Sequence, residues 1–380
     1  MGRRYKGLTW DHPRGYQALR AAAVEIAPSQ GLEIEWDIQP LEGFESHPIA
    51  DLCARYDLLV LDHPHIGDAV AAAGLQPLEA FFPASELATL DADSIGPSLR
   101  SYRHGGRTWA LPLDAASQVT AYRPDLLSSP PRTWAEVETI AEEGGLALSL
   151  AGPHAILSVL SICAALDPAN AGRASPDLFE DAIGARAVGM LQRLFERANQ
   201  TLLAENPIGI LEHMARRDDV RLCPLVYGYV NYARAAADRA ALAFSNAPSA
   251  TPDGVPGSTL GGTGIGLTAR ADVSSELLAH LRWLMSDRAQ AAFIPDHVGQ
   301  PSRRSAWQSQ IVNRQWGDFY SRTASTLETA YVRPRYQGYI AWQSLASAFV
   351  REAFACRLEP GLVARTLNAM HAEHSEGKER

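Results

Sequence analysis

The run Asp57-Leu-Leu-Val-Leu-Asp62 decides the fold that the sequence predicts. Its four central residues are all apolar, which is typical of a strand that helices cover on both faces of a parallel sheet. Upstream of this run, residues 7–10 and 32–38 are expected strands, and residues 14–28 and 49–56 are expected helices. This βαβαβ order predicts a doubly wound α/β sheet, in which ligands bind beyond the carboxyl ends of the strands.

The rest of the chain predicts a second lobe. The segment His104-Gly-Gly106 indicates a hairpin turn, and the run from Val119 then leads away from the first lobe as a hinge crossing. Residues 248–266 are rich in Pro, Gly, Ser and Thr, so we expect a loop that returns to the first lobe. The other expected elements are helices at 67–73, 134–143, 155–166, 176–199, 207–217, 274–297 and through much of 305–373, and strands at 146–150 and 220–226.

Length and composition restrict the possible functions. A chain of 380 residues, 46% apolar and 20% charged, suits two ordinary soluble domains. Its formal net charge of −9, without a long basic block, predicts that nucleic acid is not a partner. Cys53, Cys163, Cys223 and Cys356 lie far apart, so they are expected to be small apolar residues rather than metal ligands or redox thiols. No cofactor is predicted.

The N-terminus carries Arg3, Arg4 and Lys6, but the apolar stretch of about 7 to 15 residues that completes a signal peptide does not follow them. The sequence therefore predicts a cytoplasmic protein. The alternative is a periplasmic protein from which a leader has been removed. Because no apolar run approaches about 18 residues, we also expect no insertion into a membrane.

Five phrases along the chain resemble the family 1 extracellular solute-binding proteins of ATP-driven (ABC) importers, the group that includes maltose binders. Each phrase is weak alone, but their order and spacing match the family over nearly the whole chain. They are Tyr56-Asp-Leu-Leu-Val-Leu-Asp62; Ala110-Leu-Pro-Leu-Asp114 with Ala121-Tyr-Arg-Pro-Asp-Leu-Leu127; Thr133-Trp-Ala-Glu-Val137; Gly261-Gly-Thr-Gly-Ile-Gly-Leu267; and Gly299-Gln-Pro-Ser-Arg-Arg-Ser-Ala306.

This resemblance implies a two-lobed, periplasmic-binding-protein-like (class II) fold, in which each lobe is a sheet flanked by helices and the ligand cleft lies between the lobes. Hinge closure on the ligand would be its mechanism. By the same likeness, the N-terminal lobe is 1–113 plus 259–304 and the C-terminal lobe is 114–258 plus 305–380. The chain departs from the family because it shows neither a leader nor a lipid-anchor cysteine, which puts a role beside a transporter in doubt.

Two similar phrases carry the sharpest local signal: Trp10-Asp-His-Pro-Arg14 after the first strand and Asp62-His-Pro-His65 after the third. Neighbouring parallel strands end at the same edge of a sheet, so both turns should open into one crevice. We therefore expect Trp10, Asp11, His12, Arg14, Asp62, His63 and His65 to form one wall of the binding site. The alternative is that Asp11 and Asp62 only cap the helices that follow. A metal site at these side chains is a weaker alternative, and no metal is predicted.

The opposite wall is expected from the hinge and the second lobe. Asp114, with Ser117 and Gln118, lies at the first crossing, and Gly262 and Thr263 lie in a glycine-rich loop that would approach the cleft. The segment Tyr227-Gly-Tyr-Val-Asn231 offers Tyr227, Tyr229 and Asn231 as aromatic and polar contacts, although these tyrosines fit core packing equally well. Tyr336 is a further candidate, whereas the nearby Arg333 and Arg335 are expected at the surface.

The predicted function is a solute-binding protein that closes on a small polar ligand, either a sugar or a small carboxylate, with the histidines and Arg14 favouring an acid. An ABC permease is a partner only if the protein is exported, and a monomer is expected. The alternative is an enzyme that uses Asp11, His12, Asp62, His63 and His65 for acid–base or metal-assisted chemistry on an organic acid. The sequence holds no Gly-x-Ser-x-Gly nucleophile motif, so the binding protein is favoured.

Overall fold

The computed structural model describes residues 2–41, 43, 47–171 and 177–376. Nine strands are named in these ranges: β1 (Arg3–Trp10), β2 (Leu32–Gln39), β3 (Leu58–Leu61), β4 (Arg103–His104), β5 (Arg107–Thr108), β6 (Leu111–Tyr122), β7 (Leu222–Tyr227), β8 (Ala243–Ser245) and β9 (Leu260–Leu267).

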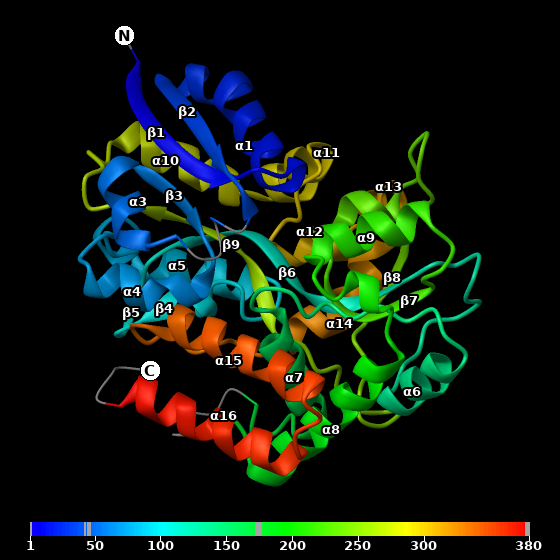
Figure 1. The fold of residues 1–380 in the computed structure, drawn as a ribbon. Helices are drawn as coiled ribbons and strands as arrows, with labels where there is room; N and C mark the ends of the chain where they lie inside the picture. Colours follow the sequence, from blue (N-terminus) through cyan, green and yellow to red (C-terminus); the bar gives the residue numbers. More distant parts are fainter. Residues whose placement is uncertain (1, 42, 44–46, 172–176, 377–380) are drawn as a thin grey trace.

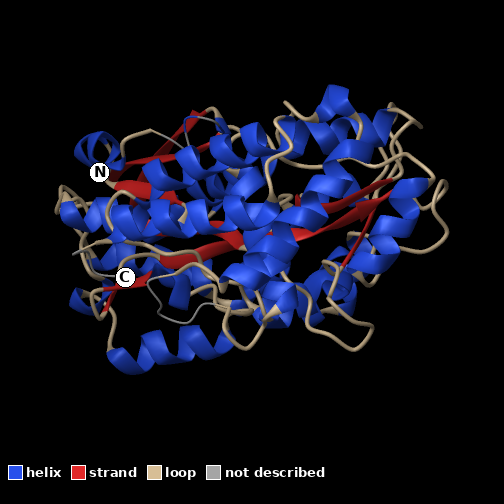
Figure 2. Cartoon of the chain, turned by 60° about the horizontal axis from the view of Figure 1, so that its bottom comes forward, coloured by secondary structure: helices blue, strands red, loops and turns tan. Residues whose placement is uncertain are grey.

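The helices are α1 (Pro13–Glu25), α3 (Ile49–Arg55), α4 (Ile66–Ala71), α5 (Ala84–Asp93), α6 (Trp134–Glu142), α7 (His154–Leu166), α8 (Asp181–Arg197), α9 (Pro207–Arg216), α10 (Ser275–Met285), α11 (Ile294–Asp296), α12 (Arg304–Gln308), α13 (Gln310–Gln315), α14 (Phe319–Glu328), α15 (Tyr339–Ala355) and α16 (Pro360–Ser375). A π-helical turn, Ala289–Phe293, precedes α11. Helices lie on both sides of the strands (Figures 1 and 2).

The predicted opening of the chain is confirmed. Strand β1 pairs in parallel with both β2 and β3, so the two Asp-His-Pro turns follow adjacent strands. Alternate residues of β3 pack into two different hydrophobic clusters: Leu58 and Val60 lie in one, and Leu59 and Leu61 lie in the other. Because β3 is buried on both faces, its central residues must all be apolar.

The sheet as a whole is mixed, in contrast to the expected parallel sheet. Its order is β2-β1-β3-β9-β6-β7, with β8 also paired to β6. Strand β9 runs antiparallel between β3 and β6, and β6 pairs with β9 along its first half and with β7 and β8 along its second half. The ladder therefore continues from one lobe into the other through β6 and β9.

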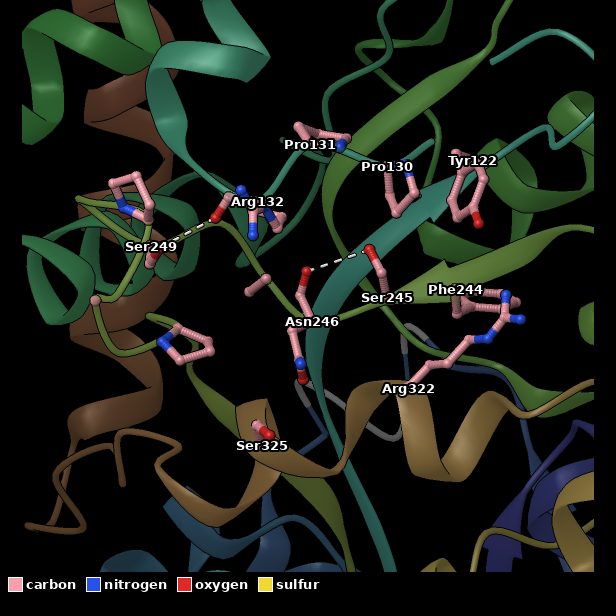
Figure 3. A pocket seen from close by; sticks show the side chains of 14 residues that line it. Tyr122, Pro130, Pro131, Arg132, Phe244, Ser245, Asn246, Ser249, Arg322 and Ser325 are labelled. Carbon is pink, nitrogen blue, oxygen red and sulfur yellow. Dashed lines mark hydrogen bonds between the residues drawn. The ribbon is translucent and has the colours of Figure 1, made fainter. Parts of the chain in front are cut away.

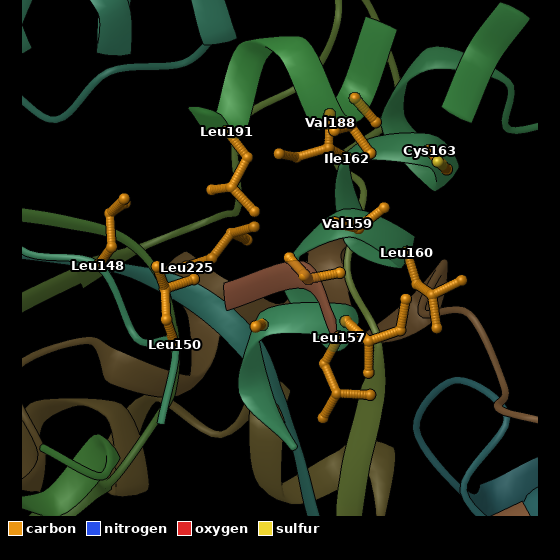
Figure 4. Close-up of a cluster of buried hydrophobic side chains, with 14 of the residues drawn as sticks. Leu148, Leu150, Leu157, Val159, Leu160, Ile162, Cys163, Val188, Leu191 and Leu225 are labelled. Carbon is orange, nitrogen blue, oxygen red and sulfur yellow. The ribbon is translucent and has the colours of Figure 1, made fainter. Parts of the chain in front are cut away.

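Two sequence expectations for single elements are wrong. Residues 248–266 are not all loop, because β9 begins at Leu260. Residues 146–150 form no strand: only Leu146 makes isolated bridges, to Ala198 and Leu222. Leu148 and Leu150 instead face a buried cluster with side chains of α7 and α8 (Figure 4). The hairpin at His104-Gly-Gly106 is confirmed by β4 and β5.

We propose the predicted boundaries as the two lobes of the molecule, because the hydrophobic clusters follow them except that Ile95 and Leu260 join a cluster of the second lobe. The clusters around β1, β2 and β3 include side chains of α1, α3 and α10. The clusters around β7 include side chains of α7, α8, α14, α15 and α16. Helices α15 and α16 pack beside α7 and α8 at the bottom of Figure 1. Below, "first lobe" and "second lobe" have this meaning.

Candidate ligand-binding site

A cavity lies between the lobes, with about 490 Å³ of empty space that is open to solvent. This figure includes open solvent, and the part of the cavity that can hold water-sized molecules is about 60 Å³, below the roughly 300–1,000 Å³ of typical small-molecule sites. The first lobe contributes side chains that follow β1, β2 and β3, and the second lobe contributes side chains from α7, α9 and the end of β7. The lining residues are Trp10, Arg14, Leu41, Asp62, Ala116, His154, Pro207, Tyr227, Tyr229, Gly261, Gly262 and Thr263.

The first Asp-His-Pro turn places Arg14 in this cavity. His12 is the N-cap of α1, and its Nδ1 atom accepts a hydrogen bond of 3.1 Å from the backbone N–H of Arg14. Pro13 supplies the first helical residue, for which its ring is suited. Burial, and then the nearby Arg14 charge, lower the pKa of His12 to about 3. The ring is therefore neutral at pH 7, and it packs edge-on against Tyr229 at 4.8 Å.

Arg14, from the first lobe, is held by Asp114 at the crossing between the lobes and by groups of the second lobe. Its Nε atom lies 2.8 Å from Oδ2 of Asp114 and its Nη2 atom bonds Oδ1, so the contact is bidentate. Its Nη1 atom donates to the carbonyl of Gly228 at 3.1 Å, and its guanidinium lies 4.9 Å from the Tyr229 ring centre. Burial raises the pKa of Asp114 while Arg14 opposes this effect, and the bidentate geometry is that of an ionised pair.

Asp62 forms a second ion pair. Its Oδ1 atom accepts from the backbone N–H of His63 at 2.9 Å, and its Oδ2 atom lies 2.6 Å from Nη2 of Arg333. Burial raises the pKa of Asp62, but the Arg333 charge and the hydrogen bonds from His63 and Arg333 together hold this pKa below its usual range. Arg333 was expected at the surface, yet it is buried and also donates to Gln343 at 3.0 Å. Both arginine charges near the cavity are thus matched by carboxylates.

The expected wall of aspartates and histidines is not assembled. Only Asp62 of that cluster lines the cavity, together with the adjacent Trp10 and Arg14. Asp11 is exposed, and His63 turns inward on a 3₁₀ turn, where it is fully buried edge-on to Tyr102. His65 lines a different cavity, between α3, α4 and the start of α15.

The tyrosine segment is partly placed as expected. Tyr227 and Tyr229 line the cavity, whereas Asn231 lies outside its lining on the 3₁₀ turn Val230–Ala233. Tyr336 does not reach the cleft. It is fully buried in the second-lobe core, where its hydroxyl lies 3.0 Å from Nδ1 of His371. An aromatic residue beside two core helices is better buried than exposed, and the sequence pattern could not separate the two cases.

Glycines at the start of β9 make room for the aromatic wall. A Cβ atom on Gly261 would lie 2.4 Å from the Tyr227 ring. Gly262 has a φ of +85° and pairs with Ala115 of β6, one residue from the irregularity in this pairing. Gly262 and Thr263, which the sequence predicted at the cleft, lie in the cavity lining. They belong to strand β9 rather than to a loop. The Oγ1 atom of Thr263 is buried and makes no hydrogen bond within the described part of the chain.

His154 is the main site residue that sequence reasoning missed. It begins α7 directly after Gly152 and Pro153, and its ring lies edge-on to Tyr227 at 5.7 Å. Burial, and then the Arg333 charge, lower the pKa of His154 to about 3, so it is a neutral hydrogen-bonding group. The turn before a helix was its only signal. Leu41, Ala116, Pro207 and Gly261 were also not predicted.

Ser117 and Gln118 lie behind the cavity rather than in it. Gln118 Oε1 accepts from Ser161 at 2.6 Å and from Thr259 at 3.1 Å, and Thr259 Oγ1 lies 3.3 Å from the Tyr227 hydroxyl. No group of three or more His, Cys, Asp or Glu residues within 2–41, 43, 47–171 and 177–376 is arranged to hold a metal ion. In the same ranges, no helix is long and apolar enough to cross a membrane.

A larger cavity, with about 1140 Å³ of empty space, lies wholly in the second lobe (Figure 3). Its lining includes Tyr122, Arg132, Asn246 and Arg322, which come from β6, α14 and the loops beside β8. Closure of the lobes would not enclose a ligand there, because the first lobe contributes no side chain. The cavity between the lobes is therefore the better candidate.

No protein-family model and no curated protein sequence matches the chain. Solved structures do. An ABC transporter solute-binding protein of Agrobacterium radiobacter K84 in complex with ribitol has a TM-score of 0.78 and 20% identity, over 98% of each chain. Maltose-bound MalE3 of T. maritima has a TM-score of 0.80 and 14% identity, over 97% of this chain and 98% of that one.

A solute-binding protein of Agrobacterium vitis S4 with bound D-mannitol has a TM-score of 0.72 and 15% identity, over 99% of this chain and 100% of that chain. These likenesses define the class of fold: the molecule has the two-lobed fold of the solute-binding proteins of ABC transporters. The predicted fold class, and the resemblance in fold, are confirmed. At these identities the likeness establishes the fold alone.

Proposed function

We propose that the protein is a solute-binding protein that closes its two lobes on a small, neutral, polyhydroxylated ligand, namely a polyol or a sugar. The carrying observation is the charge balance of the cavity. Arg14 is matched by Asp114 and Arg333 by Asp62, while His12 and His154 are neutral at pH 7. An anionic ligand would meet no uncompensated cation among these groups, so the earlier preference for an acid is given up.

The rest of the lining suits hydroxyl groups on a carbon chain or ring. Trp10, Tyr227 and Tyr229 offer flat apolar faces for C–H groups. The ion pairs Arg14–Asp114 and Arg333–Asp62 hold hydrogen-bond donors and acceptors in fixed positions. Thr263 adds a buried hydroxyl. Such groups both donate and accept hydrogen bonds, as a polyol requires. The known ligands of the similar structures, ribitol, maltose and D-mannitol, are of this class.

A binding protein is favoured over an enzyme. The proposed acid–base cluster would need Asp11, His63 and His65 near one substrate, but the first is exposed and the other two lie outside the cavity lining. The similar structures reported above are described as binding proteins. A permease partner, a monomeric state and the compartment stay predictions.

Thermal unfolding in the presence of matched ligands tests the proposal. A ligand that binds only the folded protein at 100 times its Kd adds about 2.7 kcal/mol of stability. We expect ribitol, D-mannitol or maltose to raise Tm, and the sugar acids ribonate and mannonate to have little effect. His154→Phe should abolish the increase, and Arg132→Ala, in the second-lobe cavity, should retain it. A larger increase with the acids, or an increase lost only in Arg132→Ala, would refute the proposal.

A further inference from the structure

Gln300 lies in the segment that carries the chain from α11 to α12, and it hydrogen-bonds to Ala115 of β6. The residue is fully buried. A buried amide needs partners for its polar atoms, since an unsatisfied group costs about 1–3 kcal/mol. The partners of Gln300 all belong to the cleft or to its immediate support.

On one side, Gln300 binds the strand that carries Asp114. Its carbonyl accepts from the backbone N–H of Ala115 at 3.0 Å, and its side-chain Nε2 donates to the carbonyl of Ala115 at 3.2 Å. The Gln300 backbone also opposes the rise in the pKa of the Asp114 carboxyl that burial causes. The pairing of β6 with β9 is irregular between Pro112 and Asp114, and Pro301 bridges Asp114 there. Because β7 pairs with β6 only from Gln118 onward, the edge of β6 at Ala115 is open to Gln300.

On the other side, Gln300 binds the second-lobe segment that carries Tyr229. Its Oε1 atom accepts from the backbone N–H of Val230 at 2.9 Å. Two residues earlier, the carbonyl of Gly228 accepts from Arg14 at 3.1 Å. The segment 228–230 is therefore held at one end by the first-lobe arginine and at the other end by Gln300.

We propose that Gln300 is a positioning residue that sets the Tyr229 ring against the Arg14–Asp114 pair before ligand arrives. Both the Arg14–Gly228 bond and the Gln300–Val230 bond join segment 228–230 to the first lobe. Gln300 and its partner Ala115 lie next to the crossings at 304–305 and 113–114, where opening of the lobes displaces the chain least, so the Gln300–Val230 bond is the one that keeps segment 228–230 in its binding position. This inference rests on the proposed function, because preorganisation matters only if the cavity takes a ligand. A preformed site spends less of its interaction energy on ordering side chains.

The same crossing region offers a matched control. Gln290 is also buried, and its Oε1 atom accepts from Ser302 N at 2.7 Å, while its Nε2 donates to the carbonyl of Leu284 at 2.9 Å. Gln290 therefore supports the same segment, but its side-chain hydrogen bonds go to Leu284, Ser302 and Arg303, none of which lines the cavity. Replacing either glutamine by methionine removes the same polar groups from a buried site of similar volume.

The experiment compares Gln300→Met with Gln290→Met by calorimetric titration of D-mannitol and maltose, and by amide hydrogen exchange. Both variants should lower Tm by similar amounts. Gln300→Met should weaken affinity at least about tenfold and speed exchange in the peptide covering 228–232, whereas Gln290→Met should stay within about twofold on both measures. Equal losses in the two variants, or unchanged affinity in Gln300→Met, would overturn the inference.

If neither D-mannitol nor maltose binds the unmodified protein, the proposed function fails. Hydrogen exchange still tests whether Gln300 holds segment 228–230 in place. Faster exchange at 228–232 in Gln300→Met alone supports the positioning role, and unchanged exchange overturns it. If Gln300→Met does not fold, Gln300→Asn replaces it, because the shorter amide keeps both polar groups but no longer reaches Val230. Segment 228–230 should then exchange rapidly, and slow exchange there would contradict the inference.

Discussion

Arg14 and Asp114 form an ion pair in which the Nε–Oδ2 distance is 2.8 Å and neither side chain is more than 6% exposed. Removing one partner leaves a buried charge, which costs about 3–5 kcal/mol. We therefore expect Asp114→Asn to lower the free energy of unfolding by about that amount, measured by urea denaturation. The double variant Arg14→Met, Asp114→Leu should regain most of this stability without regaining ligand binding. A double variant less stable than Asp114→Asn would contradict this account.

Replacing Thr263 is predicted to weaken ligand binding without lowering the stability of the protein. Its buried hydroxyl has no partner in the described chain, so Thr263→Val should leave Tm unchanged or raise it. Ligand affinity should fall about 3- to 10-fold, the worth of one neutral hydrogen bond. The control is Thr120→Val, because the buried Thr120 hydroxyl donates to the carbonyl of Pro224 at 3.1 Å. That variant should lower Tm and leave affinity unchanged.

The buried histidines predict a loss of stability in acid. Burial lowers the pKa of His63 to about 4 and of His154 to about 3, while the unfolded chain titrates near 6.5. The unfolded state binds more protons below pH 6.5, so unfolding becomes easier as pH falls from 6.5 toward 4. Each such histidine contributes up to about 1.4 kcal/mol per pH unit. The free energy of unfolding of His154→Phe, measured by urea denaturation at pH 7, 6 and 5, should fall less steeply with pH than that of the natural protein. An equally steep fall in the two proteins would contradict the prediction.

Alanine variants of Gly31 and Gly262 distinguish the free-energy cost of a left-handed backbone from the cost of a steric clash. Both glycines have positive φ, +85° and +77°, but a Cβ on Gly31 would meet nothing within 4 Å, whereas one on Gly262 would lie 2.4 Å from the Asp114 carbonyl oxygen. Gly31→Ala should cost about 1–2 kcal/mol, the price of the left-handed conformation. Gly262→Ala should cost more and should also weaken ligand binding. Equal shifts in Tm would show that the strand irregularity absorbs the methyl group.

The features that the sequence predicted are those set by local pattern. The apolar run of β3 reveals burial on both faces, and the Asp-His-Pro turns reveal the end of each parallel strand. Trp10, Arg14 and Asp62, which these patterns singled out, lie in the cavity lining. They did not reveal which way each side chain turns, so the histidines that follow were assigned to the same wall.

Features that depend on distant contacts were not predictable. The start of β9 is rich in glycine, which disfavours strands, yet the Tyr227 ring covers Gly261 and the Tyr102 ring covers Gly264. Those tyrosines come from remote parts of the chain. Arg333 was assigned to the surface because charged residues normally lie there, and only its pairing with Asp62 across the cleft explains its burial.

The shared strands of the sheet have a consequence for synthesis of the chain. Strand β3 pairs with β1 on one side and with β9 on the other, and β9 ends only at Leu267. In a nascent chain that has completed β3, the backbone edge of this strand of apolar residues therefore stays unpaired until the whole interval up to Leu267 has left the ribosome. Exposed strand edges of this kind invite pairing with other chains. Folding on the ribosome thus leaves the first lobe incomplete while most of the second lobe is being made, so a chaperone that shields this edge would raise the yield of native protein.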